Sequence, residues 1–195
     1  MKPRALFSLT NKTGMIPFAA QLIDRGFEIV STGTTGDQLR GAGLEIIDIA
    51  TVTGIPEGMD GRLKTISPFI AGGILADRDK PSHLEYLATH KIGGIDLVVV
   101  NLYAFNEALA AGATLVEAIE KIDIGGPSLL RAAAKNNRHC IPLPNPVDYE
   151  GYIRLFDETE GRLTPQYRLR KAAEAIRLTA DYDNAIANYL IEKAA

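Results

Sequence analysis

The chain has 195 residues, of which 46% are hydrophobic and 23% are charged, and its formal net charge is −3. This composition is typical of an ordinary globular protein of about one domain. The slight acidic excess argues against a general binder of nucleic acid or membrane surfaces, because such binders need a basic footprint. The single cysteine, Cys140, excludes an internal disulfide and favours a reducing, cytoplasmic setting. No apolar run approaches the roughly 18 residues of a membrane span.

The first half of the chain alternates short apolar runs with helical patterns, an order typical of a parallel sheet with crossover helices. Residues 4–8 predict a first strand. An apolar face predicts a helix that starts near Thr13 or Gly14, because Pro17 must lie in the first turn. Residues 27–30 and 44–49 predict two further strands, separated by a short helix over 35–42. Residues 51–69 are rich in glycine and proline, so we expect a long loop there, and such loops are usually functional or disordered.

The second half predicts one dominant strand and several helices. Residues 96–103 (DLVVVNLY) form the strongest strand pattern, and their valine run suits a strand covered on both faces. The remaining patterns predict helices over 82–90, 115–122, 126–136, 146–158 and 166–193, and a late strand over 140–143. We therefore expect a three-layer, Rossmann-like α/β fold with a parallel sheet. Residues 1–145 would form the α/β core of a single domain over 1–195, and residues 146–195 a helical C-terminal extension.

Two polar turns follow the first and second predicted strands, where ligands bind in open parallel sheets. Each turn, residues 8–14 and residues 31–36, carries hydroxyl side chains and leads into a helix start, and Lys12 adds a positive charge. Free backbone N–H groups at two such helix starts would bind a phosphate. The structural alternative is that these residues are ordinary helix caps and turn formers.

Further candidate functional residues lie in the loop, after the strongest strand and before a helix. Arg62 and Lys64 would face the same way in extended backbone, although a solvated basic patch is the simpler interpretation. Asn101 and Tyr103 end a buried strand and are expected at the crevice, unless the tyrosine is a core residue with a bonded hydroxyl. Asp123 precedes Gly125 and Gly126 at a helix start, where a turn or capping role is the alternative. Lys135 lies some 15 Å further along that helix.

Taken in order along nearly the whole chain, these segments resemble the inosine monophosphate cyclohydrolase family. The matching segments are Ser8-x-Thr10-x-Lys12-Thr13-Gly14, Ser31-Thr32-Gly33, Asp60-Gly61-Arg62-x-Lys64-Thr65, Asn101-Leu102-Tyr103, Ile122-Asp123-Ile124-Gly125-Gly126, Arg131 to Asn136 and Thr179-Ala180-x-Tyr182-Asp183. The family forms the N-terminal half of the bifunctional enzyme that ends de novo purine synthesis. The resemblance implies a methylglyoxal-synthase-like fold. It also implies ring closure of 5-formamidoimidazole-4-carboxamide ribotide to inosine monophosphate and water, without metal or organic cofactor.

The resemblance also implies roles for individual residues, and we expect all of them to line one pocket. The reacting residues would be Lys64, Tyr103, Asp123 and Lys135. Residues near the base would be Arg62, Thr65, Asn101 and Gly125. The phosphate would be held by the two turns, at Ser8, Thr10, Lys12, Thr13, Gly14, Ser31, Thr32, Gly33 and Thr34.

The chain departs from the family pattern at four positions. Ser67 and Leu178 replace usual histidines, Ala104 replaces a proline, and Thr34 replaces a frequent glycine, which makes that turn more similar to methylglyoxal synthase. Methylglyoxal synthase is the competing enzyme, although its Gly-Gly-Asp signature is absent. Two non-enzymatic interpretations stay open, namely a nucleotide-binding regulatory domain of the same fold and an unrelated interaction domain. A chain of this length leaves no room for the transformylase half, so a separate transformylase is an expected partner, and apolar positions on the last helix suggest a homodimer.

Overall fold

The structure is a computed structural model that describes residues 2–59, 62 and 64–194, so Asp60 and Gly61 of the loop motif lie outside the described residues. Its described strands form one parallel sheet in the order β3-β2-β1-β4-β5, which confirms the predicted α/β fold. The predicted positions of the strands are also confirmed to within three residues at each end. The strands are β1 (Arg4–Ser8), β2 (Glu28–Ser31), β3 (Ile46–Asp48), β4 (Leu97–Val100) and β5 (Ile141–Pro142).

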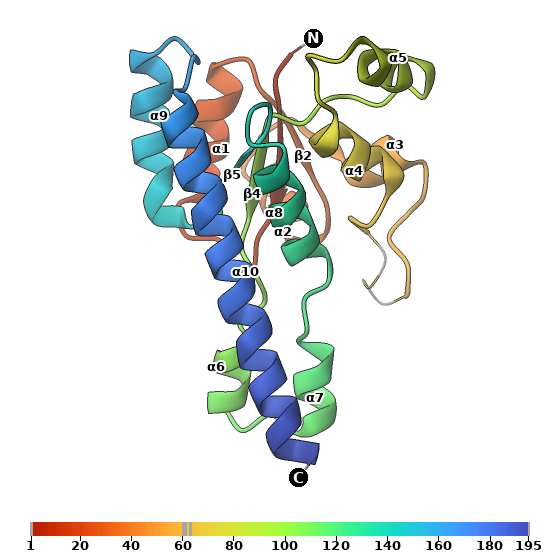
Figure 1. Cartoon of the computed structure of the whole chain (residues 1–195), viewed down its shortest axis with the longest axis vertical. Helices are drawn as coiled ribbons and strands as arrows, with labels where there is room; N and C mark the ends of the chain where they lie inside the picture. The colour runs from red at the N-terminus through yellow and green to blue at the C-terminus, as the bar shows by residue number, and fades with distance from the viewer. Residues whose placement is uncertain (1, 60–61, 63, 195) are drawn as a thin grey trace.

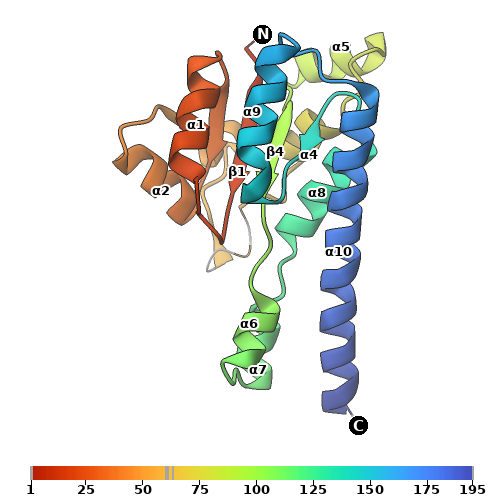
Figure 2. The same ribbon diagram turned by 90° about the vertical axis from the view of Figure 1, so that its left-hand side faces the viewer.

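Helices cover both faces of the sheet and give the three expected layers. Figure 2 shows α1 and α2 on one side of the strands and α4, α8 and α10 on the other. One face carries α1 (Met15–Asp24), α2 (Gly33–Gly41) and α9 (Tyr149–Glu158), and the other carries α4 (Pro68–Leu75), α8 (Gly125–Lys135) and α10 (Pro165–Ala194).

Strand β1 contributes to two separate hydrophobic cores because successive side chains of a strand point to opposite faces. Phe7 packs in the first core with Phe18 of α1, whose ring stacks on Tyr149 of α9 at 4.2 Å between centroids. Leu6 packs in the second core with residues of α4 and α8. All of β1 between its ends is fully buried, so the strand is the centre of the fold.

The 30-residue helix α10 extends well past the sheet (Figure 1). Two short helices, α6 (Phe105–Ala110) and α7 (Leu115–Glu120), pack beside its far half, and Phe105, Ala118 and Ile186 form a small separate core there. None of the helices in the described part of the chain has both the length and the apolarity needed to cross a membrane.

The predicted loop over 51–69 is shorter in the structure, because the residues at each of its two ends belong to a helix. Asp48 caps α3 (Ile49–Thr53) by accepting a hydrogen bond from the backbone N–H of Ala50, and Ser67 caps α4 by accepting one from Phe69. Helix α6 was also not predicted, whereas α5 (Pro81–Thr89) was, to within one residue at each end. The helical residues 146–158 divide into a short 3-10 helix, η2 (Pro146–Asp148), and α9.

The parallel register brings the ends of three strands to the same edge of the sheet. Phe7 of β1 pairs with Ser31 of β2, and Ser8 pairs with Val100 of β4. The polar segments that follow β1, β2 and β4 therefore start side by side. Helices α4 and α8 run back from this carboxyl edge towards the amino edge, as crossover helices must.

Candidate active site

The turns after β1 and β2 lie against each other at the carboxyl edge, and we call residues 8–14 and 31–34 together the anion cradle. Thr35 joins the two turns, since its hydroxyl accepts a hydrogen bond from the N–H of Leu9 at 3.1 Å and donates one to the carbonyl of Leu9 at 3.1 Å. The buried hydroxyl of Ser31 donates to the carbonyl of Phe7 at 2.9 Å. The candidate phosphate-binding residues of both turns are thus neighbours.

The two helices that start at the cradle have no side-chain cap among the described residues. Gly14, at φ 68°, precedes α1, and Thr32 precedes α2, and neither start receives a capping hydrogen bond from a side chain. Lys12 forms no ion pair within the part of the chain that the structure describes. Ordinary capping therefore does not account for these turns. Two helix starts without a side-chain cap and a nearby lysine favour binding of an anion.

Asn101, which follows β4, shapes the first turn of the cradle. Its side-chain oxygen accepts hydrogen bonds from the backbone N–H of Thr10 at 2.7 Å and of Asn11 at 3.0 Å, and its amide nitrogen donates to the carbonyl of Asn11 at 2.8 Å. The sequence placed Asn101 near the base, and in the structure its amide braces the backbone of the cradle.

Asp123 lies beside the start of α8 and is held by backbone N–H groups. Its carboxylate accepts hydrogen bonds from Gly126 at 2.8 Å and from Tyr103 at 3.3 Å. Burial raises the pKa of Asp123 above its ordinary value, while these two N–H groups and the charge of Lys64 act in the opposite direction. A half-buried carboxyl with a raised pKa is suited to accept and return a proton.

A tyrosine of the last helix fixes the backbone that carries Asp123. The hydroxyl of Tyr182 accepts a hydrogen bond from the N–H of Asp123 at 2.9 Å and donates one to the carbonyl of Lys121 at 2.9 Å. The tail motif that contains Tyr182 contributed to the family resemblance, but no pattern in the sequence indicates this contact.

The paired glycines at the start of α8 are required by close approaches. A Cβ atom on Gly125 would lie 2.4 Å from the hydroxyl oxygen of Thr65, and one on Gly126 would lie 2.6 Å from a carboxylate oxygen of Asp123. Real Cβ atoms do not approach other atoms so closely. The two glycines therefore allow Thr65 and Asp123 to lie directly against the helix start.

We expect the substitution Gly126→Ala to displace the carboxylate of Asp123. The new methyl group would also press on Leu102 at 2.7 Å. Overpacking of this kind destabilises a fold by about 1–3 kcal/mol, and kcat should fall about tenfold if the displacement costs about 1.4 kcal/mol of transition-state stabilisation. Thermal unfolding and steady-state kinetics test this. Gly151→Ala in α9, where a Cβ meets nothing within 4 Å, is the matched control, and equal effects of both variants would contradict the expectation.

Two consecutive residues, Lys64 and Thr65, connect the anion cradle with Asp123. The Lys64 ammonium lies about 4.0 Å from the position of a Cβ on Gly33, and Thr65 touches Gly125. The neighbouring Arg62 forms an ion pair with Glu120 of α7. Tyr103, whose backbone N–H bonds to Asp123, is 37% exposed. These residues and the cradle form a continuous row along the carboxyl edge.

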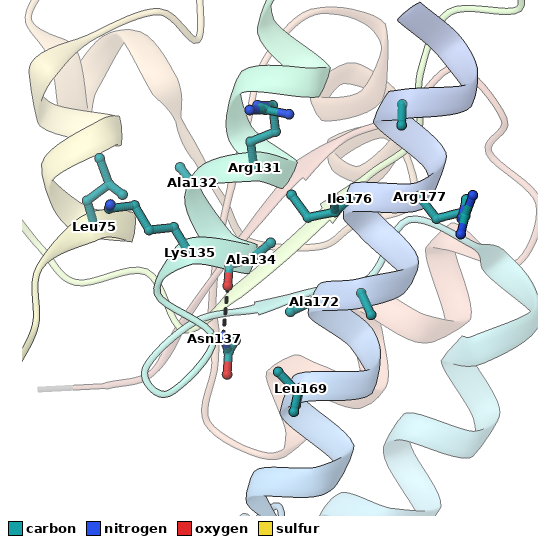
Figure 3. Close-up of a pocket in the computed structure, with 12 residues that line it drawn as sticks. Leu75, Arg131, Ala132, Ala134, Lys135, Asn137, Leu169, Ala172, Ile176 and Arg177 are labelled. Carbon is teal, nitrogen blue, oxygen red and sulfur yellow. Dashed lines mark hydrogen bonds between the residues drawn. The ribbon is translucent and has the colours of Figure 1, made fainter. Parts of the chain in front are cut away.

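Lys135 lies at the other end of α8 from this row, so one pocket for all four reacting residues stays a prediction. It ends the 11-residue helix α8, whose start carries Gly125, and the two ends lie about 15 Å apart at 1.5 Å per residue. Lys135 lines a groove of about 790 Å³ between α8 and α10, together with Arg131, Ile176 and Arg177 (Figure 3). Among the described residues, neither Lys64, Tyr103 nor Asp123 lines this groove.

Asn136, which follows Lys135, shows that this end of α8 has a structural role. Its side-chain amide donates to the carbonyls of Ile74 at 2.6 Å and Ala76 at 2.9 Å, so it ties the end of α8 to the end of α4. The motif from Arg131 to Asn136 therefore includes residues that fix the amino edge of the fold rather than the candidate site.

The positions that depart from the family pattern are accommodated locally. Ser67 caps α4, Leu178 packs against the second core, and Ala104 precedes α6. One further residue at the site was not predicted from the sequence. Glu57, in the loop after α3, lies 3.8 Å from the Lys64 ammonium, and its only sequence signal is an acidic residue in a basic, glycine-rich loop.

Comparison with known proteins agrees with this arrangement. The MGS-like domain family matches residues 14–128, and the family described as AICARFT/IMPCHase bienzyme matches residues 133–195. Two curated relatives are named "Bifunctional purine biosynthesis protein PurH". The one from Halalkalibacterium halodurans is 49% identical over 98% of this chain and 38% of its own length, and the one from Deinococcus radiodurans is 50% identical over 97% and 36%.

These matches confirm the resemblance that the motifs indicate, although the chain spans little more than a third of the length of those relatives. A solved structure described as "Crystal structure of ForH" is 36% identical, with a TM-score of 0.82, over 95% of this chain and 97% of that one. By the match over residues 14–128, the chain belongs to the MGS-like domain family.

Proposed function

We propose that the chain is a cyclohydrolase that closes the pyrimidine ring of 5-formamidoimidazole-4-carboxamide ribotide and releases inosine monophosphate and water. One observation supports this most. A cradle for a phosphate and the half-buried carboxyl of Asp123 lie at the same sheet edge, and the consecutive residues Lys64 and Thr65 connect them. A ribotide carries its charged phosphate at one end and its reacting groups at the other. These two ends match the cradle and Asp123. The relatives named PurH support the same activity.

The anion cradle would anchor the 5′-phosphate, and Lys12 would contribute a full positive charge. Holding the ribotide at this end places the carboxamide and the formyl group next to each other near Asp123. Both reacting groups belong to one molecule, so binding in a folded conformation supplies much of the rate acceleration.

Ring closure then requires stabilisation of a developing negative charge and transfer of protons. The carboxamide nitrogen attacks the formyl carbon, a C–N bond forms, and the electrons of the C=O double bond move to oxygen. We assign the stabilisation of this oxyanion to the Lys64 ammonium, supported by Tyr103. Asp123 would accept the proton that the carboxamide nitrogen loses and pass it to the oxyanion, which becomes a hydroxyl. It would then accept the proton of the formamide nitrogen and pass it to this hydroxyl, so that the C–O bond breaks, water leaves and the C=N bond of the ring forms. Lys135 receives no step within one chain, because α8 separates it from the row.

The direct test is to follow the ultraviolet absorbance of the hypoxanthine ring while the purified chain acts on the formylated ribotide. We expect turnover without added metal. Binding of inosine monophosphate without turnover would instead support the regulatory domain, and release of phosphate from dihydroxyacetone phosphate would support methylglyoxal synthase. Either result overturns the proposal.

We also propose the context in which the reaction takes place. Its substrate carries a formyl group, so a formyl-transfer reaction must supply it. The chain would act as one domain and as a homodimer, since Leu169, Ile176 and Ile191 of α10 are exposed apolar residues. The buried thiol of Cys140, whose pKa burial raises, agrees with a reducing, cytoplasmic setting.

A further inference from the structure

Glu57 places a carboxylate at the start of α2, inside the anion cradle. One of its oxygens lies 3.4 Å from the hydroxyl of Thr32, which donates a hydrogen bond to it, and the other lies 3.8 Å from the Lys64 ammonium. A Cβ atom on Gly33 would lie 3.6 Å from the first of these oxygens. The carboxylate is therefore seated against the turn that we assign to the phosphate.

The surroundings of this carboxylate are those of a bound anion. The start of α2 has no side-chain cap among the described residues, so its positive end is available to a negative group. A lysine ammonium and a threonine hydroxyl complete the environment. A phosphate monoester would use the helix start and the threonine hydroxyl, with one more oxygen and a higher negative charge.

A phosphate and the Glu57 carboxylate cannot both occupy this turn, because like charges at such distances repel each other. The Glu57 side chain is 36% exposed, so it can turn outward into solvent. The Lys64 side chain is 25% exposed and lies within the electrostatic influence of Asp123, so it has an alternative carboxylate at the reacting end.

We propose that Glu57 takes the place of the substrate's phosphate in the free protein, and that phosphate binding displaces it and releases Lys64 towards Asp123. This inference rests on the proposed function, and it assigns to Glu57 a specificity role. A ligand without a phosphate leaves Glu57 and Lys64 paired. The binding energy of the phosphate is therefore used to free Lys64 for the reaction.

The experiment compares inosine monophosphate, inosine and inorganic phosphate as probes of the wild type and of Glu57→Gln, by calorimetry. Glutamine keeps the size of the side chain and removes its charge. We expect the Kd of inosine monophosphate and of inorganic phosphate to fall about tenfold, within the usual range of coupling between competing groups. The Kd of inosine should stay unchanged. Glu85→Gln, an exposed residue of α5, is the matched control and should shift none of them.

Two results would overturn the inference. Equal changes in the Kd of inosine and of inosine monophosphate would show that Glu57 does not act at the phosphate. A fall in kcat with unchanged phosphate affinity would make Glu57 a partner of Lys64 in the working state. Thermal melting of each variant verifies that it is folded, and Glu57→Ala repeats the test if glutamine retains the contact with Thr32. Because the calorimetry measures binding alone, tighter phosphate binding without ring closure would reject the proposed reaction and keep this inference.

Discussion

The substitution Lys64→Met should lower kcat for ring closure by about 10²–10³-fold, the usual cost of removing one group that stabilises a developing oxyanion. Methionine preserves the length and packing of the stem but removes the ammonium. The charge lost is the one that lies between Gly33 of the cradle and Asp123. Affinity for inosine monophosphate should change only a few-fold, since no oxyanion exists in the bound product.

Steady-state kinetics and calorimetry together separate the two effects. Lys80→Met, which alters an exposed lysine just before α5, is the control for loss of a lysine charge and should leave both quantities unchanged. If Lys64→Met weakens nucleotide binding as much as it lowers kcat, Lys64 binds the ground state and has no special role in the transition state.

The substitution Asp123→Asn should reduce kcat by about 10²–10⁴-fold, the usual contribution of a general acid–base. Asparagine can still accept a backbone hydrogen bond from Gly126 or Tyr103, but it cannot accept a proton from the carboxamide nitrogen. Product affinity should fall much less than kcat.

The pH dependence gives an independent signature of this role. Burial raises the pKa of Asp123, so the carboxylate becomes protonated at a higher pH than an exposed aspartate, whose pKa is about 3.9. Activity that needs the ionised form should therefore decline as the pH falls through this raised pKa, and the residual rate of Asp123→Asn should lack that decline. Asp24→Asn at the exposed end of α1 is the control. An unchanged acid limb in Asp123→Asn would assign the titration to another group.

The sheet could be predicted because local patterns and tertiary structure agree there. Residues 4–8 were placed as a strand with the bounds that the structure gives to β1, and Pro17 located the start of α1. Where the two disagree, the prediction failed. The apolar run ending at Tyr103 leaves the sheet after Val100, because Asn101 turns to brace the cradle and the backbone of Tyr103 bonds to Asp123.

Site residues that directly follow a strand could be predicted from the sequence. Those that the fold brings in from distant segments could not. Ser31 and Thr32 end β2, so their position at the crevice followed from topology alone. Glu57 contacts the cradle because of the conformation of its loop. The sequence of that loop has no periodic pattern from which this conformation could be predicted. The spacing along the sequence already placed Lys135 about 15 Å from the start of its helix, and the length of α8 agrees with that.

The phenol of Tyr182 has a consequence for anyone who trims or fuses this protein. A single hydroxyl on the last helix holds the segment between Lys121 and Asp123. A cut in α10 ahead of that residue would remove this contact, so the proposed proton carrier would be held at its carboxylate, by Gly126 and Tyr103, but no longer at its own amide.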